Sequence, residues 1–325
     1  MKICILGTGN WAKVHAKIIA QNKNLQLVGF FSRSRRSIVE SDLNYVCYSS
    51  IAEMIKKCAP NICLVANATR FHYEDAITVL REGCGVVIEK PIDVSVVELT
   101  NLHDLSRENG VFAGVCLPQR YDEIFQQLRL LSRSNYFGPI DFIDIKTFYS
   151  RSDESIERIL SQTLNDNQYA LLKHYGIHYY DATCYALDLK NLRFNMDLSV
   201  DNIRGTFRSG TLLLTVANSK TQMSITFSTN SSPGRRNSLE VIGKKKSLYV
   251  NCHGIFSEAD EQLYVSGNSS FEDHLKLLWL DLYQLSNSND LRSSRIALGN
   301  LLNTNHLFPE CVSKTATLSY RFSLL

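Results

Sequence analysis

The feature that most constrains the fold of this chain lies in its first fifteen residues, MKICILGTGNWAKVH. An apolar run at 3–6 ends directly at a glycine turn, and a helical pattern follows over 11–21. In this order Gly7 permits a tight turn, Gly9 lets the backbone approach a phosphate, and Ala12 takes the third small position. Free N–H groups and the positive end of the helix dipole then face the anion. The motif predicts a dinucleotide site, with a structural turn as the alternative; a P-loop is excluded because no Gly-Lys-Ser/Thr follows.

Bulk properties limit the class of protein. The 325 residues suggest two domains, and 44% hydrophobic with 21% charged residues is ordinary for a globular protein. A net charge of +3 is too weak and too dispersed to indicate a nucleic-acid partner. The nine cysteines include no C-x-x-C pair, which favours a reducing compartment. No signal peptide and no apolar run of membrane-spanning length is evident, so a cytoplasmic protein without a membrane partner is expected.

The first part of the chain alternates short apolar strands with helical segments. Strands are predicted at 2–6, 25–31, 62–66, 86–88 and 111–115, and helices at 11–21, 51–57, 73–82 and 95–109. Such alternation predicts a parallel sheet with helices on both faces. Residues 1–118 are therefore expected to form a doubly wound Rossmann domain for a dinucleotide.

The pattern changes after residue 118. Helices are predicted at 119–133, 166–187, 271–286 and 295–302, and strands at 141–149, 192–198, 202–207, 211–218, 222–228, 238–242 and 247–250. Consecutive strands with hairpin-length gaps indicate a largely antiparallel sheet. Residues 119–325 are expected to form an α+β domain with one large open sheet, for substrate binding and oligomerisation.

The end of the second predicted strand bears on the choice of cofactor. NAD-specific domains place an acidic residue there for the ribose 2′-hydroxyl, but none appears before Glu40. The segment Ser32-Arg33-Ser34-Arg35-Arg36 offers hydroxyl and guanidinium donors instead, which suit a 2′-phosphate. NADP(H) is therefore predicted over NAD(H), with a solvated basic turn as the alternative.

A second motif, Glu89-Lys90-Pro91, follows the strand predicted at 86–88. Ligands of open α/β sheets bind outside the carboxyl ends of the strands. Lys90 at that place is a candidate proton donor, and its bond to Pro91 is of the kind that adopts the cis form. A surface Glu-Lys turn is the alternative.

The motifs occur in a fixed order: Gly7-Thr8-Gly9…His15, Val65-Ala66-Asn67-Ala68-Thr69-Arg70-Phe71-His72, Glu89-Lys90-Pro91 and Gly176-Ile177-His178-Tyr179-Tyr180-Asp181. In this order the chain resembles the glucose–fructose oxidoreductase / inositol dehydrogenase (Gfo/Idh/MocA) family over nearly its whole length. The resemblance implies a Rossmann domain followed by an open-sheet α/β domain, and oxidation or reduction of a sugar carbinol with NAD(P).

The resemblance also assigns residues. Lys90 would contact the reacting oxygen and the nicotinamide ribose, and His178 would act as acid/base or orient the substrate. Asn67, Thr69 and His72 fall on the cofactor loop, and Arg120 falls where the family often contacts the cofactor. Glu89 belongs to the same set through its motif.

One position departs from the family pattern. Many members carry Asp four residues before the histidine, where this chain has His174. A carboxylate that would keep the lysine charged is thus absent at that position. On a regular helix His174, His178 and Asp181 would share one face, which leaves a metal site or ordinary polar positions as alternatives. Gly176 within that helix suggests a close approach of backbone or ligand.

The leading hypothesis is an NADP(H)-dependent oxidoreductase acting on a sugar or sugar derivative, free or nucleotide-linked. The alternatives are an NAD-retaining sugar dehydrogenase and a non-catalytic NAD(P)-binding regulator. A homo-oligomer formed through the second domain's sheet is expected, without a metal. The expected catalytic residues are Lys90, His178 and His174. The expected substrate contacts are Lys90, Tyr121, Tyr149, His174 and His178. The expected cofactor contacts are Gly7, Thr8, Gly9, Asn10, Trp11, Ser32, Arg33, Arg36, Asn67, Thr69, His72, Glu89, Lys90 and Arg120.

Overall fold

In the part of the chain that the structure describes, six parallel strands form the first sheet, in the order β3-β2-β1-β4-β5-β6. They are β1 (Lys2–Leu6), β2 (Gln26–Phe31), β3 (Cys47–Tyr48), β4 (Ile62–Val65), β5 (Gly85–Ile88) and β6 (Ala113–Val115). The computed structural model describes residues 1–33, 46–162, 169–190, 192–203, 206–216, 219–231, 236–288, 290 and 293–299. The predicted doubly wound sheet is confirmed, and β3 is a strand that the sequence pattern did not indicate.

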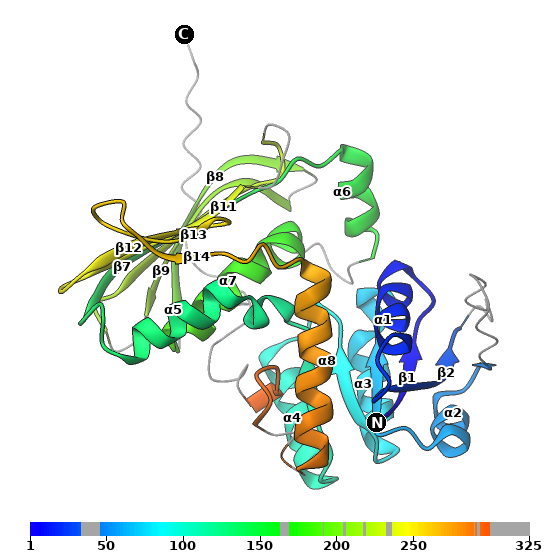
Figure 1. Cartoon of the computed structure of the whole chain (residues 1–325). Coiled ribbons are helices and arrows are strands. Elements are labelled where there is room, and N and C mark those ends of the chain that lie inside the picture. The colour runs from blue at the N-terminus through cyan, green and yellow to red at the C-terminus, as the bar shows by residue number, and fades with distance from the viewer. Residues whose placement is uncertain are drawn as a thin grey trace. The chain divides into compact units, whose positions relative to one another are not determined.

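The helices of this sheet are α1 (Asn10–Ala20), α2 (Ile51–Cys58), α3 (His72–Arg81) and α4 (Val96–Glu108). Figure 1 shows β1 and β2 beside helix α1. Their starts follow from local chemistry, since Ser50 caps α2 and Ser95 forms a capping box with Glu98 at α4. The strand order reverses between β1 and β4, so right-handed crossovers carry α1 and α3 to opposite faces. The carboxyl ends of β1 and β4 therefore border the switch point at which such sheets bind ligands.

The chain divides into two compact units. The first contains Met1–Tyr121 with Gln162 and returns at Ser270, so it also holds the 3₁₀ turn η2 (Pro118–Tyr121) and helix α8 (Phe271–Asn287). The second contains Asp122–Ser161 and the described residues of 169–269. Across the residues described, no helix combines the length and the apolar character needed to cross a membrane.

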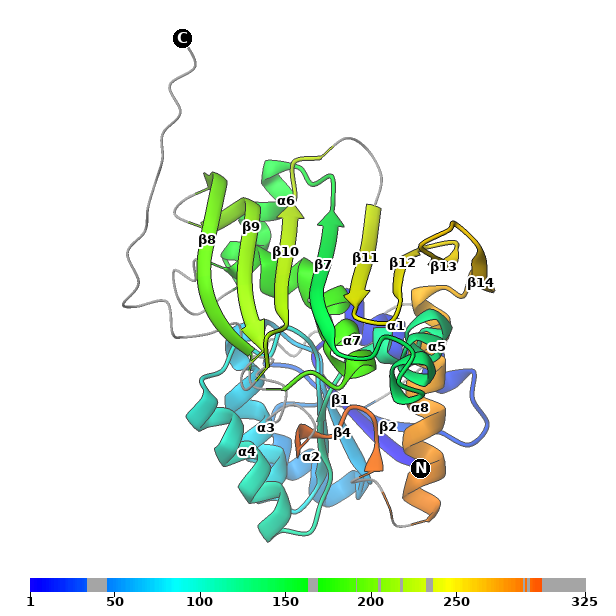
Figure 2. The same ribbon diagram turned by 90° about the vertical axis from the view of Figure 1, so that its left-hand side faces the viewer.

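The second unit is built on an eight-stranded sheet in the order β14-β13-β12-β11-β7-β10-β9-β8 (Figure 2). Only β7 and β10 pair in parallel, so the predicted, mostly antiparallel open sheet is confirmed. The strands are β7 (Ile140–Phe148), β8 (Leu192–Ile203), β9 (Thr206–Val216), β10 (Gln222–Ser228), β11 (Arg236–Gly243), β12 (Ser247–Asn251), β13 (Gly254–Ser257) and β14 (Gln262–Val265).

Among its described residues, the second unit has the helices α5 (Glu123–Arg133), α6 (Asp153–Leu160) and α7 (Ile177–Leu187). A π-helical turn, η3 (Leu172–Gly176), precedes α7. The prediction of one regular helix over 166–187 is therefore wrong at the π turn, and 163–168 lies outside the described residues. The predicted helix over 119–133 is likewise two elements, because the side chain of Asp122 caps a new helix at Glu123.

Candidate functional site

The turn between β1 and α1 has the backbone that a phosphate-binding loop requires. Gly7 has a φ of +126°, and a Cβ there would lie 2.6 Å from the carbonyl oxygen of Ala66. Only glycine tolerates both the conformation and this close approach. Its N–H donates to the carbonyl oxygen of Phe31 at 2.9 Å, which fixes the turn against the neighbouring strand.

The start of α1 fits an anion. Gly9 is the N-cap residue, no side chain caps the helix, and its first turn contains no acidic residue. A Cβ at Gly9 would meet no heavy atom within 4 Å, so the backbone opens onto free space. Ala12 is fully buried at the third small position, as the motif predicts. The residues present therefore fit a dinucleotide pyrophosphate at this helix end.

The carboxyl end of β2 carries the residues predicted to select the cofactor. Arg33 donates to both carboxylate oxygens of Asp75, at 2.9 and 2.5 Å, and its guanidinium carbon lies 4.0 Å from the ring centroid of Phe71. Two of five guanidinium N–H groups are used in this pair, and 39% of the side chain remains exposed. Ser32 beside it is buried. Arg36, the other residue predicted there, lies outside the described residues.

Hydrogen bonds of Asn67 and His72 hold the loop after β4 in place. The amide nitrogen of Asn67 donates to Asp75, while its buried Oδ1 has no hydrogen-bond partner among the described residues. His72 is buried, with Nδ1 3.0 Å from the carbonyl oxygen of Pro91 and Nε2 3.1 Å from that of Asn67. Burial lowers the pKa of His72, so the neutral ring donates to one carbonyl at a time. Thr69 lies in the 3₁₀ turn η1 (Thr69–Phe71).

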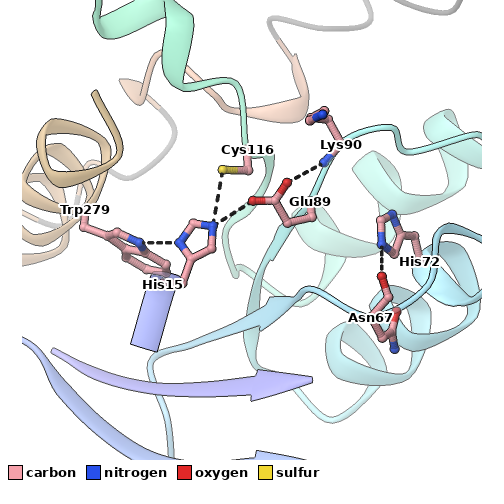
Figure 3. A network of polar contacts seen from close by, with 7 residues as sticks. All are labelled: His15, Asn67, His72, Glu89, Lys90, Cys116 and Trp279. Atoms are coloured by element: carbon pink, nitrogen blue, oxygen red, sulfur yellow. Dashed lines mark hydrogen bonds and ion pairs between the residues drawn. The ribbon is translucent and has the colours of Figure 1, made fainter. Parts of the chain in front are cut away.

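Glu89, Lys90 and Pro91 follow β5 directly, at the sheet edge where β1 also ends (Figure 3). The Lys90–Pro91 peptide bond is cis. The carboxylate of Glu89 is buried, and its Oε2 accepts the main-chain N–H of Lys90 at 3.1 Å. The side chain of Lys90 is partly exposed. The motif thus pairs a buried carboxylate with a lysine that solvent reaches.

The second oxygen of Glu89 is bound by His15 of α1. The Nε2 of His15 lies 2.7 Å from Oε1, and its Nδ1 accepts the indole N–H of Trp279 at 2.9 Å. An indole only donates, so Nδ1 carries no proton and the proton of a neutral ring lies on Nε2. His15 therefore donates to Glu89 as a neutral imidazole.

This assignment bears on metal binding. His15, Glu89 and Cys116 place one ligand atom each within 4.8 Å of one another, and Cys116 Sγ lies 3.9 Å from His15 Nε2. A metal would need the Nε2 lone pair, which the proton fixed by Trp279 occupies. Burial raises the pKa of the Cys116 thiol well above its ordinary value, which also disfavours the thiolate ligand. These residues form a hydrogen-bonded cluster that does not suit a metal.

The ionisation of Glu89 results from opposing influences. Burial is the largest and raises the pKa of Glu89. The interaction with His15 and, after it, the charge of Lys90 act in the other direction, and the net pKa lies below its ordinary value. Glu89 is therefore a buried carboxylate at neutral pH.

The second unit carries the two predicted histidines. His174 lies in the π turn, with its ring 4.8 Å from that of Tyr175, and His178 is buried in the first turn of α7. Since a π turn has a different period from an α-helix, the prediction that one regular helix face carries these histidines and Asp181 is wrong. Within the described residues, they do not form a cluster of close metal ligands.

Local packing explains the glycine between the two histidines. A Cβ at Gly176 would lie 2.5 Å from Cδ1 of Leu172 and 3.4 Å from Cδ2 of Phe227 on β10. The close approach predicted from Gly176 is therefore made to side chains of the protein's own core. Tyr149, expected to touch the substrate, is buried and donates its hydroxyl to the carbonyl oxygen of Tyr175 at 2.8 Å.

Two predicted residues of η2 lie in the interior of the first unit. Arg120 is buried and donates to the carbonyl oxygen of Arg295. Tyr121 is buried and donates to Asp281 at 2.7 Å. Both bind the segment that returns after Ser270, so their side chains secure α8 to the first unit.

Sequence reasoning assigned no role to three residues that contact the side chains of this site: His15, Asp75 and Trp279. The spacing of His15 after the glycine turn was a usable signal, because it puts the side chain on the sheet-facing side of α1. Asp75 and Trp279 carried no local signal, since each is defined by partners that are distant in sequence.

Part of the sequence is similar to known oxidoreductases. Residues 1–116 match the model of an oxidoreductase family with an NAD-binding Rossmann fold. The chain is 26% identical over 144 residues to D-glucoside 3-dehydrogenase of Escherichia coli (strain K12), covering 43% of this chain and 41% of that protein. It is 27% identical over 154 residues to glucose-6-phosphate 3-dehydrogenase of Bacillus subtilis (strain 168), covering 46% and 43%. The matches span less than half the length of these curated relatives.

The similarity of fold covers more of the chain than these sequence matches do. The crystal structure of the WlbA dehydrogenase from Bordetella pertussis, in complex with NADH and UDP-GlcNAcA, has a TM-score of 0.75 to this chain at 16% identity. The likeness covers 93% of this chain and 92% of that one. At this identity it shows a shared two-part fold, and the chemistry must be argued from the residues.

Proposed function

We propose that the chain is an NADP(H)-dependent oxidoreductase of the Gfo/Idh/MocA family that acts on a sugar or sugar derivative. Residues 1–116 match the model of that family, which supports the proposal. The observation that carries this proposal is the sheet edge of the first unit. There the β1–α1 turn, shaped for a pyrophosphate, and Lys90 after β5 both follow the carboxyl ends of parallel strands. A dinucleotide grip and a proton donor at one edge suit hydride transfer coupled to proton transfer.

The cofactor is held by groups of the first unit. Amides at the start of α1 bind the pyrophosphate, Asn67 Oδ1 offers a buried acceptor, and Arg33 keeps exposed N–H donors beyond its pair with Asp75. Ser32, Thr69 and the neighbouring turn residues Thr8, Asn10 and Trp11 complete the proposed contacts. The remaining donors of Arg33 favour a 2′-phosphate, which supports NADP(H) over NAD(H). A lower KM for NADH than for NADPH would contradict this preference.

The chain's residues supply the proton chemistry. Bound cofactor would provide or accept the hydride at the substrate carbon. In the reducing direction the Lys90 ammonium gives a proton to the carbonyl oxygen, and in the oxidising direction the Lys90 amine takes it back from the hydroxyl. His178 orients the substrate hydroxyl or relays that proton, and His174 lies in the turn before it.

The substrate class follows the relatives. Two of them are named for oxidation at position 3 of a glucoside or of glucose 6-phosphate, and the structure of a third holds a UDP-sugar. We therefore propose a sugar hydroxyl, free, phosphorylated or nucleotide-linked, as the reacting group. A panel of such sugars assayed with each nicotinamide cofactor identifies the substrate.

The decisive test replaces the proton donor. Lys90→Met is expected to keep NADPH binding, measured by calorimetric titration, and to lose about 10²- to 10⁴-fold in kcat, the range for a general acid–base group. Lys17→Met, an exposed lysine of α1, is the matched control and should leave kcat unchanged. Turnover in Lys90→Met equal to that of the control would overturn the mechanism.

A further inference from the structure

The carboxylate of Glu89 is bound through both oxygens. His15 Nε2 lies 2.7 Å from Oε1, and the main-chain N–H of Lys90 lies 3.1 Å from Oε2 (Figure 3). Both bonds come from elements at the carboxyl edge of the sheet, the helix after β1 and the segment after β5. A carboxylate held at two points has little freedom to turn away, so its charge stays beside the lysine backbone.

The hydrogen-bond chain also fixes the charge of the cluster. Trp279 donates to His15 Nδ1 at 2.9 Å, which leaves the ring neutral with its proton on Nε2. A neutral donor satisfies Glu89 without cancelling its charge, whereas an imidazolium would form a neutral pair with it. Glu89 therefore presents a full negative charge to its surroundings.

Two other titratable groups near Glu89 are neutral, so they do not compensate its charge. Cys116, after β6, has a pKa raised well above its ordinary value by burial and by Glu89, so it remains a neutral thiol. His72, at the start of α3, has a pKa lowered by burial and is neutral at pH 7. The charge of Lys90 is among the influences that lower the pKa of Glu89. Electrostatic interaction is reciprocal, so the Glu89 carboxylate acts equally on the lysine.

We propose that Glu89 is a positioning residue, held by His15 and Trp279, which fixes the Lys90 main chain and favours the ammonium form of its side chain. The significance for catalysis rests on the proposed function, but the charge effect is a property of the protein alone.

The test measures the protonation of Lys90 without turnover. Reductive methylation of the full-length, cofactor-free protein is followed by mass spectrometry of the Lys90 peptide from about pH 6 to about pH 11, a range that brackets an ordinary lysine. Glu89→Gln keeps the shape and removes the charge. The pH of half-maximal labelling is expected to fall, because the variant loses an opposite charge beside the lysine. Equal labelling curves for the two proteins would overturn the proposal.

Two further measurements separate charge from structure. Glu89→Asp keeps the charge but shortens the side chain, so it should keep the wild-type labelling curve while kcat falls; a curve matching Glu89→Gln would overturn the charge argument. Long-range ¹H–¹⁵N spectra of wild-type His15 need no variant and should show a protonated Nε2 with a bare Nδ1. A protonated Nδ1 would overturn the hydrogen-bond chain. Because neither readout depends on turnover, both stand even where Lys90→Met refutes the proposed function.

Discussion

The Arg33 guanidinium donates two hydrogen bonds to Asp75, and part of the side chain stays exposed after the end of β2. The pair holds the side chain in place, and stacking on Phe71 limits its rotation. A 2′-phosphate would therefore meet a donor that is already ordered, so less entropy is lost on binding.

Arg33→Ala tests this arrangement. The KM for NADPH is expected to rise by about 10- to 100-fold, because hydrogen bonds to charged groups contribute about 1.5–3 kcal/mol. The KM for NADH should change far less, since NADH lacks the phosphate. Arg70→Ala removes another arginine beside the same Phe71 ring and serves as the control in steady-state assays. An equal rise for both cofactors in Arg33→Ala would assign Arg33 to the adenosine and not to the phosphate.

The role of a residue could be predicted from the sequence where it belongs to a local motif. Gly7 and Lys90 belong to motifs whose function is written in neighbouring positions, and their placement at one sheet edge follows from parallel strand order. Trp279 and His15 are 264 positions apart, so their hydrogen bond exists only after the chain has folded back. In the sequence Asp75 is an ordinary carboxylate of a predicted helix, and its ion pair with Arg33 is formed only in the folded structure.

At the level of elements, the β1–α1 turn contains two glycines that are required for different reasons. Gly7 has a positive φ and no room for a Cβ, whereas Gly9 has an ordinary backbone and open space. Gly7 is needed for the conformation of the turn, and we expect Gly9 to leave room for the phosphates of the cofactor.

Alanine at each position separates these two requirements. Gly7→Ala should lower the free energy of unfolding by about 1–3 kcal/mol from backbone strain alone, and more from the contact with Ala66. Gly9→Ala should keep the wild-type melting temperature but weaken NADPH binding by about 10-fold or more, since its methyl group occupies the phosphate's approach. Thermal unfolding and calorimetric titration measure both quantities; equal melting temperatures for the two variants would contradict this division.

Element boundaries were predictable where caps are local and were missed where packing decides. Ser95 with Glu98 marks the start of α4 in the sequence itself. The π turn at 172–176 has no such mark, and its last residue, Gly176, lies against Phe227 of a strand that is distant in sequence. Likewise β8 runs unbroken over Leu192–Ile203, although its sequence pattern suggested two strands.

At the scale of the whole chain, strand alternation predicted both sheets, but the return of α8 to the first unit left no trace in sequence order. That return is made by buried partners: Arg120 and Tyr121 bind Arg295 and Asp281, and Trp279 binds His15. The expected domain boundary at residue 118 stays a prediction, while the two compact units follow these contacts.

The outer face of the second sheet bears on the proposed homo-oligomer. Its buried face carries Val241 and Leu248, and strand alternation turns the next residues outward. Large apolar side chains are exposed there along β11, β12 and the edge strand β14: Ile242 (36%), Tyr249 (42%), Leu263 (40%) and Val265 (66%). Figure 2 shows these strands side by side at one end of the sheet. Apolar side chains gathered next to an unpaired edge are typical of an interaction surface.

We expect this face to join copies of the chain, so that light scattering after gel filtration gives a dimer or larger assembly at micromolar concentration. Tyr249→Lys combined with Val265→Lys places charge in the contact and should shift the mass toward the monomer, because buried unpaired charges oppose association. Leu277→Lys, an exposed leucine of α8 in the first unit, is the control and should keep the assembly. A monomeric wild type would refute the oligomer, and dissociation by Leu277→Lys alone would move the interface to α8.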